Sequence, residues 1–193
     1  MPALTLPSLS AQASFLAAVD EMRAEGQLDP TGPIARAVAT YGSSWQDPAE
    51  FQRFLDDLRA QEREETPRPE NFVPTTDLWW IDGVSVPARP SVFPERPSVF
   101  LGRPSIRHRL ARGQIGLRNG HIGYEVRPSA RRQGHATAML AASLPWARRI
   151  GLDSVLLTCD DDNEASRRTI ERNGGVPDEP IGEKLRYWIS TAP

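Results

Sequence analysis

The sequence of 193 residues has little of several residue types, and each shortage excludes a class of protein. Its one cysteine, Cys159, allows neither an intramolecular disulfide nor a cysteine-based metal cluster. No apolar run reaches the length of a transmembrane helix. The net charge of −2 gives no overall basic footprint, which argues against bulk nucleic-acid binding. We therefore expect a cytoplasmic protein with no membrane or nucleic-acid partner, and the sequence leaves homodimer formation open.

The first third of the chain carries two amphipathic patterns. Apolar residues recur at helical spacing over residues 13–24, which predicts a helix. A second helix is predicted over residues 48–63, with Asp47 as its N-cap. Residues 1–11 are expected to be poorly ordered. Because two short helices bury too little surface to stand alone, we interpret residues 1–70 as a helical extension packed on a larger domain.

The larger domain is expected over residues 71–193. Its apolar run at residues 154–159 is typical of a strand covered on both faces. An Arg-Pro-Ser-Val/Ile repeat occurs three times within residues 89–106, and its prolines exclude a helix. We interpret residues 84–104 as a Pro/Arg-rich insertion that lengthens a hairpin, with a strand resuming near residues 99–107. A proline-rich peptide ligand is the alternative interpretation.

The segment Arg131-Arg132-Gln133-Gly134-His135-Ala136 lies between a predicted strand and a helix rich in alanine and leucine. The strand is expected over residues 121–126 and the helix over residues 134–150. The first turn of a helix has unpaired N–H groups, and the helix dipole adds positive potential there. Gly134 would let the backbone approach a ligand closely. The pattern therefore predicts a binding site for a phosphate group.

These residues also carry a family resemblance. Arg-x-x-Gly-x-Ala after a strand ending in Val-x-Pro resembles the acyl-CoA signature of the GNAT superfamily of N-acetyltransferases. A second similar segment occupies residues 163–175, and the resemblance extends over roughly residues 75–190, where it is similar to a subgroup of predicted acetyltransferases. It implies an α/β (α+β) fold, with a central mixed, mostly antiparallel sheet flanked by helices and preceded by N-terminal helices.

The resemblance further implies an activity and a co-substrate. The protein would be an N-acetyltransferase that moves an acetyl group from acetyl-CoA to an amine of a small molecule or peptide, by direct transfer in a ternary complex. The turn would grip the pyrophosphate of coenzyme A, and Val126 would align the pantetheine arm. The implied cofactor-binding residues are Val126, Arg131, Arg132, Gln133, Gly134, His135, Ala136, Thr137, Asn163 and Ser166. For Asn163, a plain helix N-cap is the alternative.

Glu125 is the first candidate for the general base of this reaction. Strand alternation places His121, Gly123 and Glu125 on one face. A carboxylate there could take a proton from the acceptor amine directly or through water. The alternative is a surface carboxylate paired with an arginine. His121 has a suitable intrinsic titration range, but a buried structural histidine is the more common outcome.

The general acid is where the sequence departs from the family. Many members carry a tyrosine seven residues after the position of Asn163, and Ile170 stands there in this chain. Tyr187 is the candidate that could replace it, although its alternation with apolar neighbours favours a core position. Cys159 is interpreted as an inert core thiol. The missing tyrosine favours a second hypothesis, a non-catalytic acyl-CoA-binding regulatory module, and the insertion favours a third, an interaction protein.

Overall fold

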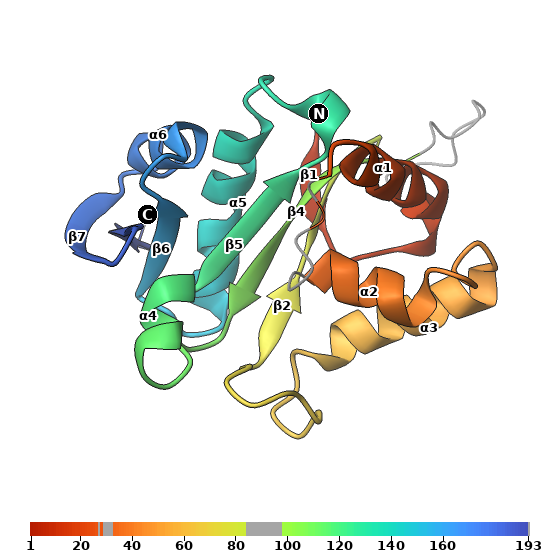
Figure 1. Cartoon of the computed structure of the whole chain (residues 1–193), viewed down its shortest axis with the longest axis horizontal. Helices are drawn as coiled ribbons and strands as arrows, with labels where there is room; N and C mark the ends of the chain where they lie inside the picture. The colour runs from red at the N-terminus through yellow and green to blue at the C-terminus, as the bar shows by residue number, and fades with distance from the viewer. Residues whose placement is uncertain (27, 29–32, 84–97, 193) are drawn as a thin grey trace.

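The computed structural model describes residues 1–26, 28, 33–83 and 98–192, which form sheets flanked by helices (Figure 1). The helices are α1 (Gln12–Ala24), α2 (Pro33–Tyr41), α3 (Pro48–Ala60), α4 (Gln114–Asn119), α5 (His135–Arg149) and α6 (Glu164–Arg172), with 3-10 turns η1 (Leu9–Ala11) and η2 (Pro128–Ala130). The strands are β1 (Ala3–Thr5), β2 (Thr75–Asp77), β3 (Trp79–Asp82), β4 (Val99–Arg107), β5 (Ile122–Val126), β6 (Ser154–Asp160), β7 (Val176–Ile181) and β8 (Lys184–Ser190). Within these ranges, no helix is long and apolar enough to cross a membrane.

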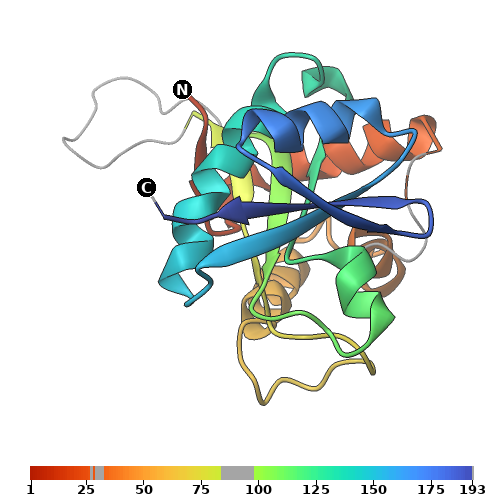
Figure 2. The same ribbon diagram turned by 90° about the vertical axis from the view of Figure 1, so that its left-hand side faces the viewer.

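The described strands form two sheets. The first has the order β1-β3-β4-β2, with β5 paired to β4, and the second has the order β6-β8-β7. Each of these pairings is antiparallel. Figure 2 looks at the second sheet, in blue, which stands in front of the green strands of the first. The predicted fold class, mostly antiparallel strands with flanking and N-terminal helices, is confirmed.

The two sheets meet at one end of β5 and β6 and then diverge. His121 N donates to Leu156 O at 2.7 Å, and Leu156 N donates to the ring nitrogen His121 Nδ1 at 2.8 Å. Beyond this point, no ladder pairs β5 with β6 in the described part of the chain. The edge of β5 that faces away from β4 is therefore unpaired among the described residues, and we call the space beside this edge, on the side of β6, the opening.

The helices α1, α2 and α3 cover one face of the first sheet (Figure 1), and Phe15 of α1 is the centre of that core. Its ring stacks on Trp79 of β3 with a centroid distance of 4.9 Å. Phe51 and Phe54 of α3 contact the same ring at 5.8 and 5.6 Å. The N-terminal helices therefore bury their aromatic residues directly against the sheet.

The helices α5 and α6 cover the opposite face (Figure 1). Leu140 of α5 and Ile170 of α6 are fully buried there with Leu157 of β6 and Ile106 of β4. This second core joins strands of both sheets to the helix that follows the arginine-rich turn. It fixes the start of α5 relative to the opening between β5 and β6.

Local signals predicted the N-terminal helices well. The helix expected over residues 13–24 is α1, and the one expected over residues 48–63 is α3, which ends slightly earlier, at Ala60. Asp47 Oδ1 accepts from the N–H groups of Ala49 at 2.8 Å and Glu50 at 3.2 Å, which confirms the predicted N-cap.

The expectation that residues 1–11 are poorly ordered is wrong. Ala3–Thr5 form β1, which pairs with β3 in the register Ala3 to Ile81 and Thr5 to Trp79. An unpaired edge of β3 would leave backbone N–H and C=O groups without partners, and β1 satisfies them. The ordering comes from the sheet edge rather than from any propensity of the segment itself.

The region of the proposed insertion is described only in part. Residues 84–97, with the first two copies of the repeat, lie outside the described residues. The strand expected near residues 99–107 is β4, so the third copy, at residues 103–106, belongs to the sheet and not to an insertion that reaches residue 104. The short helix α4 between β4 and β5 was not predicted, and it is bounded by Gly113 and Gly120, whose φ values of 67° and 62° suit glycine.

Candidate active site

The turn that leads into α5 is built on two left-handed residues. Arg132 has φ 63° and Gly134 has φ 82°, and space is open within 4 Å of the position that a Cβ on Gly134 would occupy. Ala138 N donates to Gly134 O at 3.1 Å, so hydrogen bonding within the helix begins at Ala138. The N–H groups of residues 135–137 precede it, and no side chain caps this helix start in the described chain. Unpaired N–H groups at the positive end of a helix are the kind of group that can bind an anion.

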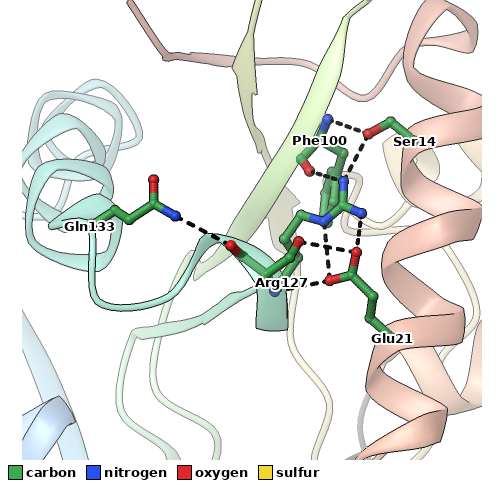
Figure 3. A network of polar contacts seen from close by, with 6 residues as sticks. Ser14, Glu21, Phe100, Arg127 and Gln133 are labelled. Carbon is green, nitrogen blue, oxygen red and sulfur yellow. Dashed lines mark hydrogen bonds and ion pairs between the residues drawn. The ribbon is translucent and has the colours of Figure 1, made fainter.

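Helix α1 holds this turn from the side (Figure 3). Glu21 accepts hydrogen bonds from Arg127 Nη2 and, at 3.3 Å, Arg127 Nε, and from both N and Oγ of Ser129 at 3.0 Å. These bonds, chiefly those from Arg127, lower the pKa of Glu21 to about 2, although partial burial opposes them. Arg131 Nη1 forms an ion pair with Glu25 at 2.8 Å, so the charge of Arg131 is shared with α1.

Other residues of the turn also have defined contacts. Gln133 Nε2 donates to Ser129 O at 3.2 Å (Figure 3), which closes the turn on itself. Trp80 Nε1 donates to His135 Nδ1 at 3.3 Å and ties the start of α5 to β3. Thr137 O accepts from Asn173 Nδ2 at 3.2 Å. The helix start is therefore anchored by side chains while its N–H groups stay available.

The end of β5 presents backbone groups to the opening. Arg107 N donates to His121 O at 2.8 Å, and Arg127 N donates to Leu101 O at 2.9 Å, so residues 121 and 127 face β4. Because hydrogen bonding alternates along a strand, the backbone groups of Tyr124 and Val126 face the other edge, toward the opening. This is the arrangement that an added extended chain with amide groups would need.

On the far side of the opening lies the start of α6. Asn163 caps the helix, with its Oδ1 accepting from Ser166 N at 3.0 Å, which is the alternative that the sequence left open for this residue. Ser166 Oγ lies 2.9 Å from Tyr124 Oη of β5, so the two sides of the opening are bridged by hydroxyl groups. Burial raises the pKa of Tyr124, and its phenol keeps its proton at neutral pH.

Glu125 faces the other side of the sheet. Its Oε1 lies 3.3 Å from Arg103 Nη1, and Arg103 also forms a buried ion pair with Asp77 and donates to Ser105 Oγ at 2.8 Å. Burial opposes the charge on Arg103, but Asp77 and Glu125 outweigh it and raise the pKa of the guanidinium. Glu125 thus has an arginine partner, as the alternative interpretation held, and its side chain stays 39% exposed.

The remaining sequence candidates occupy structural positions. Burial, with a further contribution from Arg107, lowers the pKa of His121 to about 4, and its Nδ1 accepts from the backbone, so the ring is neutral at pH 7. Tyr187 is buried in the core against α6 and donates to Glu171 Oε1 at 3.5 Å. Burial raises the pKa of Cys159, which suits an inert thiol. The structure therefore does not bring Tyr187 together with Glu125, because Tyr187 lies on β8 in the core of the second sheet, whereas Glu125 of β5 contacts Arg103 in the first sheet.

A cavity of about 620 Å³ lies between the sheet and the helices α2 and α3. Side chains of β4 and β2 form its floor, and residues of α2, α3, α4 and the segment before β2 form its walls. The floor contains Asp77, Arg103, Ser105 and Arg107. The ion pair that holds Glu125 is thus part of the cavity surface, and the carboxylate stands at the border between the cavity and β5.

Several residues of this site were not identified from the sequence. Arg103 and Ser105 belong to the third copy of the repeat, which was interpreted as part of an insertion. Asp77 is a single acidic residue before an aromatic strand, and nothing in the local sequence marks it as a site residue. Strand alternation places Tyr124 on the face opposite Glu125, but its contact with Ser166 depends on how β5 and α6 approach each other. Strand alternation around residues 103–107 would have shown that their alternate side chains share one face.

Comparisons with known proteins agree with this geometry. A family model described as an acetyltransferase (GNAT) domain matches residues 34–176. No curated protein sequence matches the chain at a significant level. Among solved structures, the ribosomal-protein-S5-alanine acetyltransferase of Vibrio fischeri has a TM-score of 0.60 at 12% identity, covering 97% of this chain and 92% of that protein.

Two further structures are complexes with coenzyme A species. RimJ of Mycobacterium smegmatis, with CoA-disulfide, has a TM-score of 0.59 at 18% identity, covering 97% of this chain and 80% of that one. The microcin C7 self-immunity acetyltransferase MccE, with acetyl-CoA and AMP, has a TM-score of 0.53 at 12% identity, covering 97% and 91%. At these levels of sequence identity, the similarities to solved structures show the fold alone. Because the family model matches most of the sequence, the chain belongs to the GNAT family of acetyltransferases.

Proposed function

We propose that the protein is an N-acetyltransferase that moves an acetyl group from acetyl-CoA to an amine of a small molecule or peptide. The observation that carries the proposal is that the anion-binding turn before α5 lies beside the opening between β5 and β6. The turn suits a pyrophosphate, and the exposed edge of β5 suits an extended arm that bears amide groups. Family membership supports the reaction, and the CoA complexes of RimJ and MccE support the choice of co-substrate.

The coenzyme would extend from the turn along β5. Backbone N–H groups of residues 134–137 bind the pyrophosphate, and exposed Arg132 adds positive charge. Arg131, paired with Glu25, acts mainly by fixing the turn. Val126 lies along the pantetheine arm, and the start of α6 with Asn163 closes the other side. The remaining proposed contacts are made by Gln133, His135, Ala136, Thr137 and Ser166.

Glu125 would remove the proton from the acceptor amine, directly or through a water molecule. An alkyl ammonium titrates near 10 in water, so a base is needed at neutral pH. The neutral amine then attacks the thioester carbonyl and the new C–N bond forms. The attacking nitrogen gives up one further proton to solvent, the C–S bond breaks, and coenzyme A leaves as a thiolate that takes up one proton. Arg103 positions the Glu125 carboxylate at the edge of the cavity, which would hold the acceptor.

The leaving thiolate needs a proton. Of the two candidate donors, Tyr187 and Tyr124, only one lies beside the opening. Tyr187, proposed from the sequence, is buried on β8, and its hydroxyl donates to the exposed Glu171 of α6. Tyr124 instead places its hydroxyl between β5 and α6, next to Ser166. We therefore propose Tyr124 rather than Tyr187 as the residue that stabilises or protonates the thiolate.

A non-catalytic acyl-CoA-binding regulatory module is the second candidate function. One observation favours it: Ile170, at the position where many family members carry the acidic tyrosine, is fully buried and supplies no proton. Both functions require coenzyme A to bind at the turn, so binding alone does not separate them. Release of the coenzyme A thiol in the presence of an amine does.

Calorimetric titration with acetyl-CoA tests the binding site through Gly134→Val. A valine side chain would occupy the open space that the coenzyme needs, and we expect affinity to fall about tenfold or more, as for loss of one or more charged hydrogen bonds. The same change also strains the backbone, because φ is 82° at this position.

Gly151→Val is the matched control for that strain. Gly151 follows the other end of α5, with φ 92° and open space at the position of its Cβ. Both variants should lose similar stability, but Gly151→Val should keep the wild-type affinity for acetyl-CoA. Unchanged affinity in Gly134→Val, or equal loss in both variants, would contradict the proposed site.

A further inference from the structure

Arg107 has an unusual setting on the floor of the cavity. It lies on β4, and its Nη1 donates to Asn119 O at 3.1 Å and to Gly120 O at 3.4 Å. The same nitrogen lies 3.9 Å from the position that a Cβ on Gly123 of β5 would take. The guanidinium therefore extends across β5, two residues along that strand from Glu125.

Arg107 differs from its neighbour Arg103 in its partners. Arg103 is held by two carboxylates, whereas Arg107 has no carboxylate within ion-pair distance in the described part of the chain. Its Nη1 binds carbonyl oxygens, and its Nε and Nη2 donate to no described residue. A partly buried guanidinium without a counter-ion is costly, and an anionic ligand would compensate it.

The charges around Arg107 also favour an anionic ligand. Burial lowers the pKa of Arg107, and the positive charges of Arg103 and Arg36 add to this effect against the opposing charge of Asp77. The carboxylates that line the cavity are engaged: Asp77 pairs with Arg103, and Asp57 accepts from the hydroxyl of Tyr41. Neither of these carboxylates therefore forms an ion pair with Arg107.

Part of the cavity wall is aromatic and apolar, and polar residues such as Gln61 and Asn71 lie beside it. Phe72 lies beneath the guanidinium of Arg36 at 4.7 Å, and Phe54 and Ile115 line the same space. Such walls suit the carbon skeleton of a small organic molecule, while a small number of polar groups fix its orientation.

We propose that Arg107 binds an anionic group of the acceptor, a carboxylate or a phosphate, and so selects amines that carry one. The acceptor would place its anionic group on Arg107 and its amine at Glu125. Because Gly123 and Glu125 are two residues apart on one strand, the two groups are separated by about 7 Å, which a small amino acid derivative or short peptide can span. This inference rests on the proposed function for the role of Glu125, but the anion site itself does not.

Three aromatic probes of similar size test the anion site on the full-length protein: benzoate, its neutral isostere benzamide, and the cation benzylammonium. Titrations followed by NMR should show benzoate binding in the millimolar range and about tenfold or more tighter than either other probe, as expected for a charge-assisted hydrogen bond. Phenyl phosphate in a parallel titration distinguishes a phosphate preference from a carboxylate preference. Equal binding of benzoate and benzamide, tighter binding of benzylammonium, or no benzoate binding would overturn the proposal.

Arg107→Gln should abolish the preference for benzoate. Arg112→Gln is the matched control, because Arg112 follows in the next loop and is exposed. Arg107→Lys keeps the charge and should keep part of the preference, which covers the case in which the glutamine variant does not fold. Retention of the full benzoate preference in Arg107→Gln would contradict the assignment.

A failure of the anion site at Arg107 can be distinguished from a failure of the proposed transferase function. If benzoate binds through Arg107 but no amine releases thiol from acetyl-CoA, the anion site stands and the transferase proposal fails. If thiol is released, amino acids should react at least about tenfold faster in kcat/KM than their amides. Equal rates for both would show that the transferase acts without this selection.

Discussion

Glu125 combines partial exposure with a contact to a buried guanidinium. Arg103 is fixed by Asp77 from β2, and this pair holds one carboxylate oxygen of Glu125 at the border of the cavity. If Glu125 is the base, as we propose, this contact would hold its carboxylate in place for the acceptor amine, and positioning of this kind is a large part of catalysis in bisubstrate reactions.

The first prediction concerns Glu125→Gln. If Glu125 is the general base, turnover at neutral pH should fall by roughly 10²–10⁴-fold, while the dissociation constant for acetyl-CoA stays nearly unchanged. The loss should shrink at high pH, because more of the acceptor is already neutral and needs no base. Initial rates across the pH range, with calorimetric acetyl-CoA binding, measure both effects.

Glu64→Gln serves as the control for this change. Glu64 forms an exposed ion pair with Arg109, at 2.5 Å, at the surface of the molecule. This variant should keep wild-type rates at every pH. A Glu125→Gln protein with wild-type turnover throughout would rule out Glu125, and a water chain would then have to carry the proton.

At the scale of elements, α1 supports the turn before α5, which we propose binds the coenzyme. Glu21 binds Arg127 and Ser129, which flank the start of η2, and Arg127 Nη1 also donates to Ser14 Oγ and Phe100 O, both at 3.1 Å (Figure 3). The Glu21 carboxylate thus connects α1 to the turn directly and to β4 through Arg127. Disturbing the Glu21 carboxylate should therefore loosen the turn, although Glu21 is not among the residues proposed to contact the coenzyme.

The second prediction follows from the pKa of Glu21, which is lowered from 4.5 to about 2 chiefly by hydrogen bonds from Arg127. A carboxyl with a lowered pKa in the folded state stabilises the protein fully above its unfolded pKa. This contribution is lost as the pH falls from 4.5 toward 2. The free energy of unfolding, measured with urea at stepped pH, should therefore fall more steeply for the wild type than for Glu21→Gln.

Asp20→Asn is the matched control on the same helix. Asp20 forms an exposed ion pair with Arg23, one turn along α1. Its pH profile should follow that of the wild type. Parallel profiles for the wild type and Glu21→Gln between pH 4.5 and 2 would show that the network in Figure 3 contributes nothing to stability.

Elements with strong local signals were predicted from the sequence, and those that depend on distant partners were not. The N-cap at Asp47 and the glycine before α5 act within one helical turn, so the sequence alone was enough to predict them. Strand β1 is ordered by the edge of β3, some 75 residues away in the register Ala3 to Ile81. The contact between Arg103 and Asp77 likewise depends on the register between β2 and β4, which cannot be predicted from a local sequence pattern.

At the scale of the whole molecule, we propose that the N-terminal helices and the sheet fold as one cooperative unit. Phe15 of α1 is 1% exposed and contacts rings of α3, β3 and β4. The third prediction is that Phe15→Ala lowers the free energy of unfolding by about 3–5 kcal/mol, as for other buried aromatic residues. Urea denaturation followed by far-UV circular dichroism and by tryptophan fluorescence should give coincident transitions.

Leu9→Ala provides the comparison for that variant. Leu9 lies just before α1 and is 42% exposed, so its loss should change stability by about 0.5 kcal/mol or less. Two separated transitions, with the helices of residues 12–60 melting apart from the rest, would show instead that the N-terminal part is a separate unit.

The measurement that tests the central claim most directly is release of the coenzyme A thiol from acetyl-CoA by the wild-type protein. The panel of amines should include amino acids, their amides and short peptides, with mass spectrometry of the products. The account predicts thiol release that requires both protein and amine and saturates with each substrate, with the acetyl group found on the amine nitrogen. Tight binding of acetyl-CoA without thiol release for any amine would contradict it and favour the regulatory module.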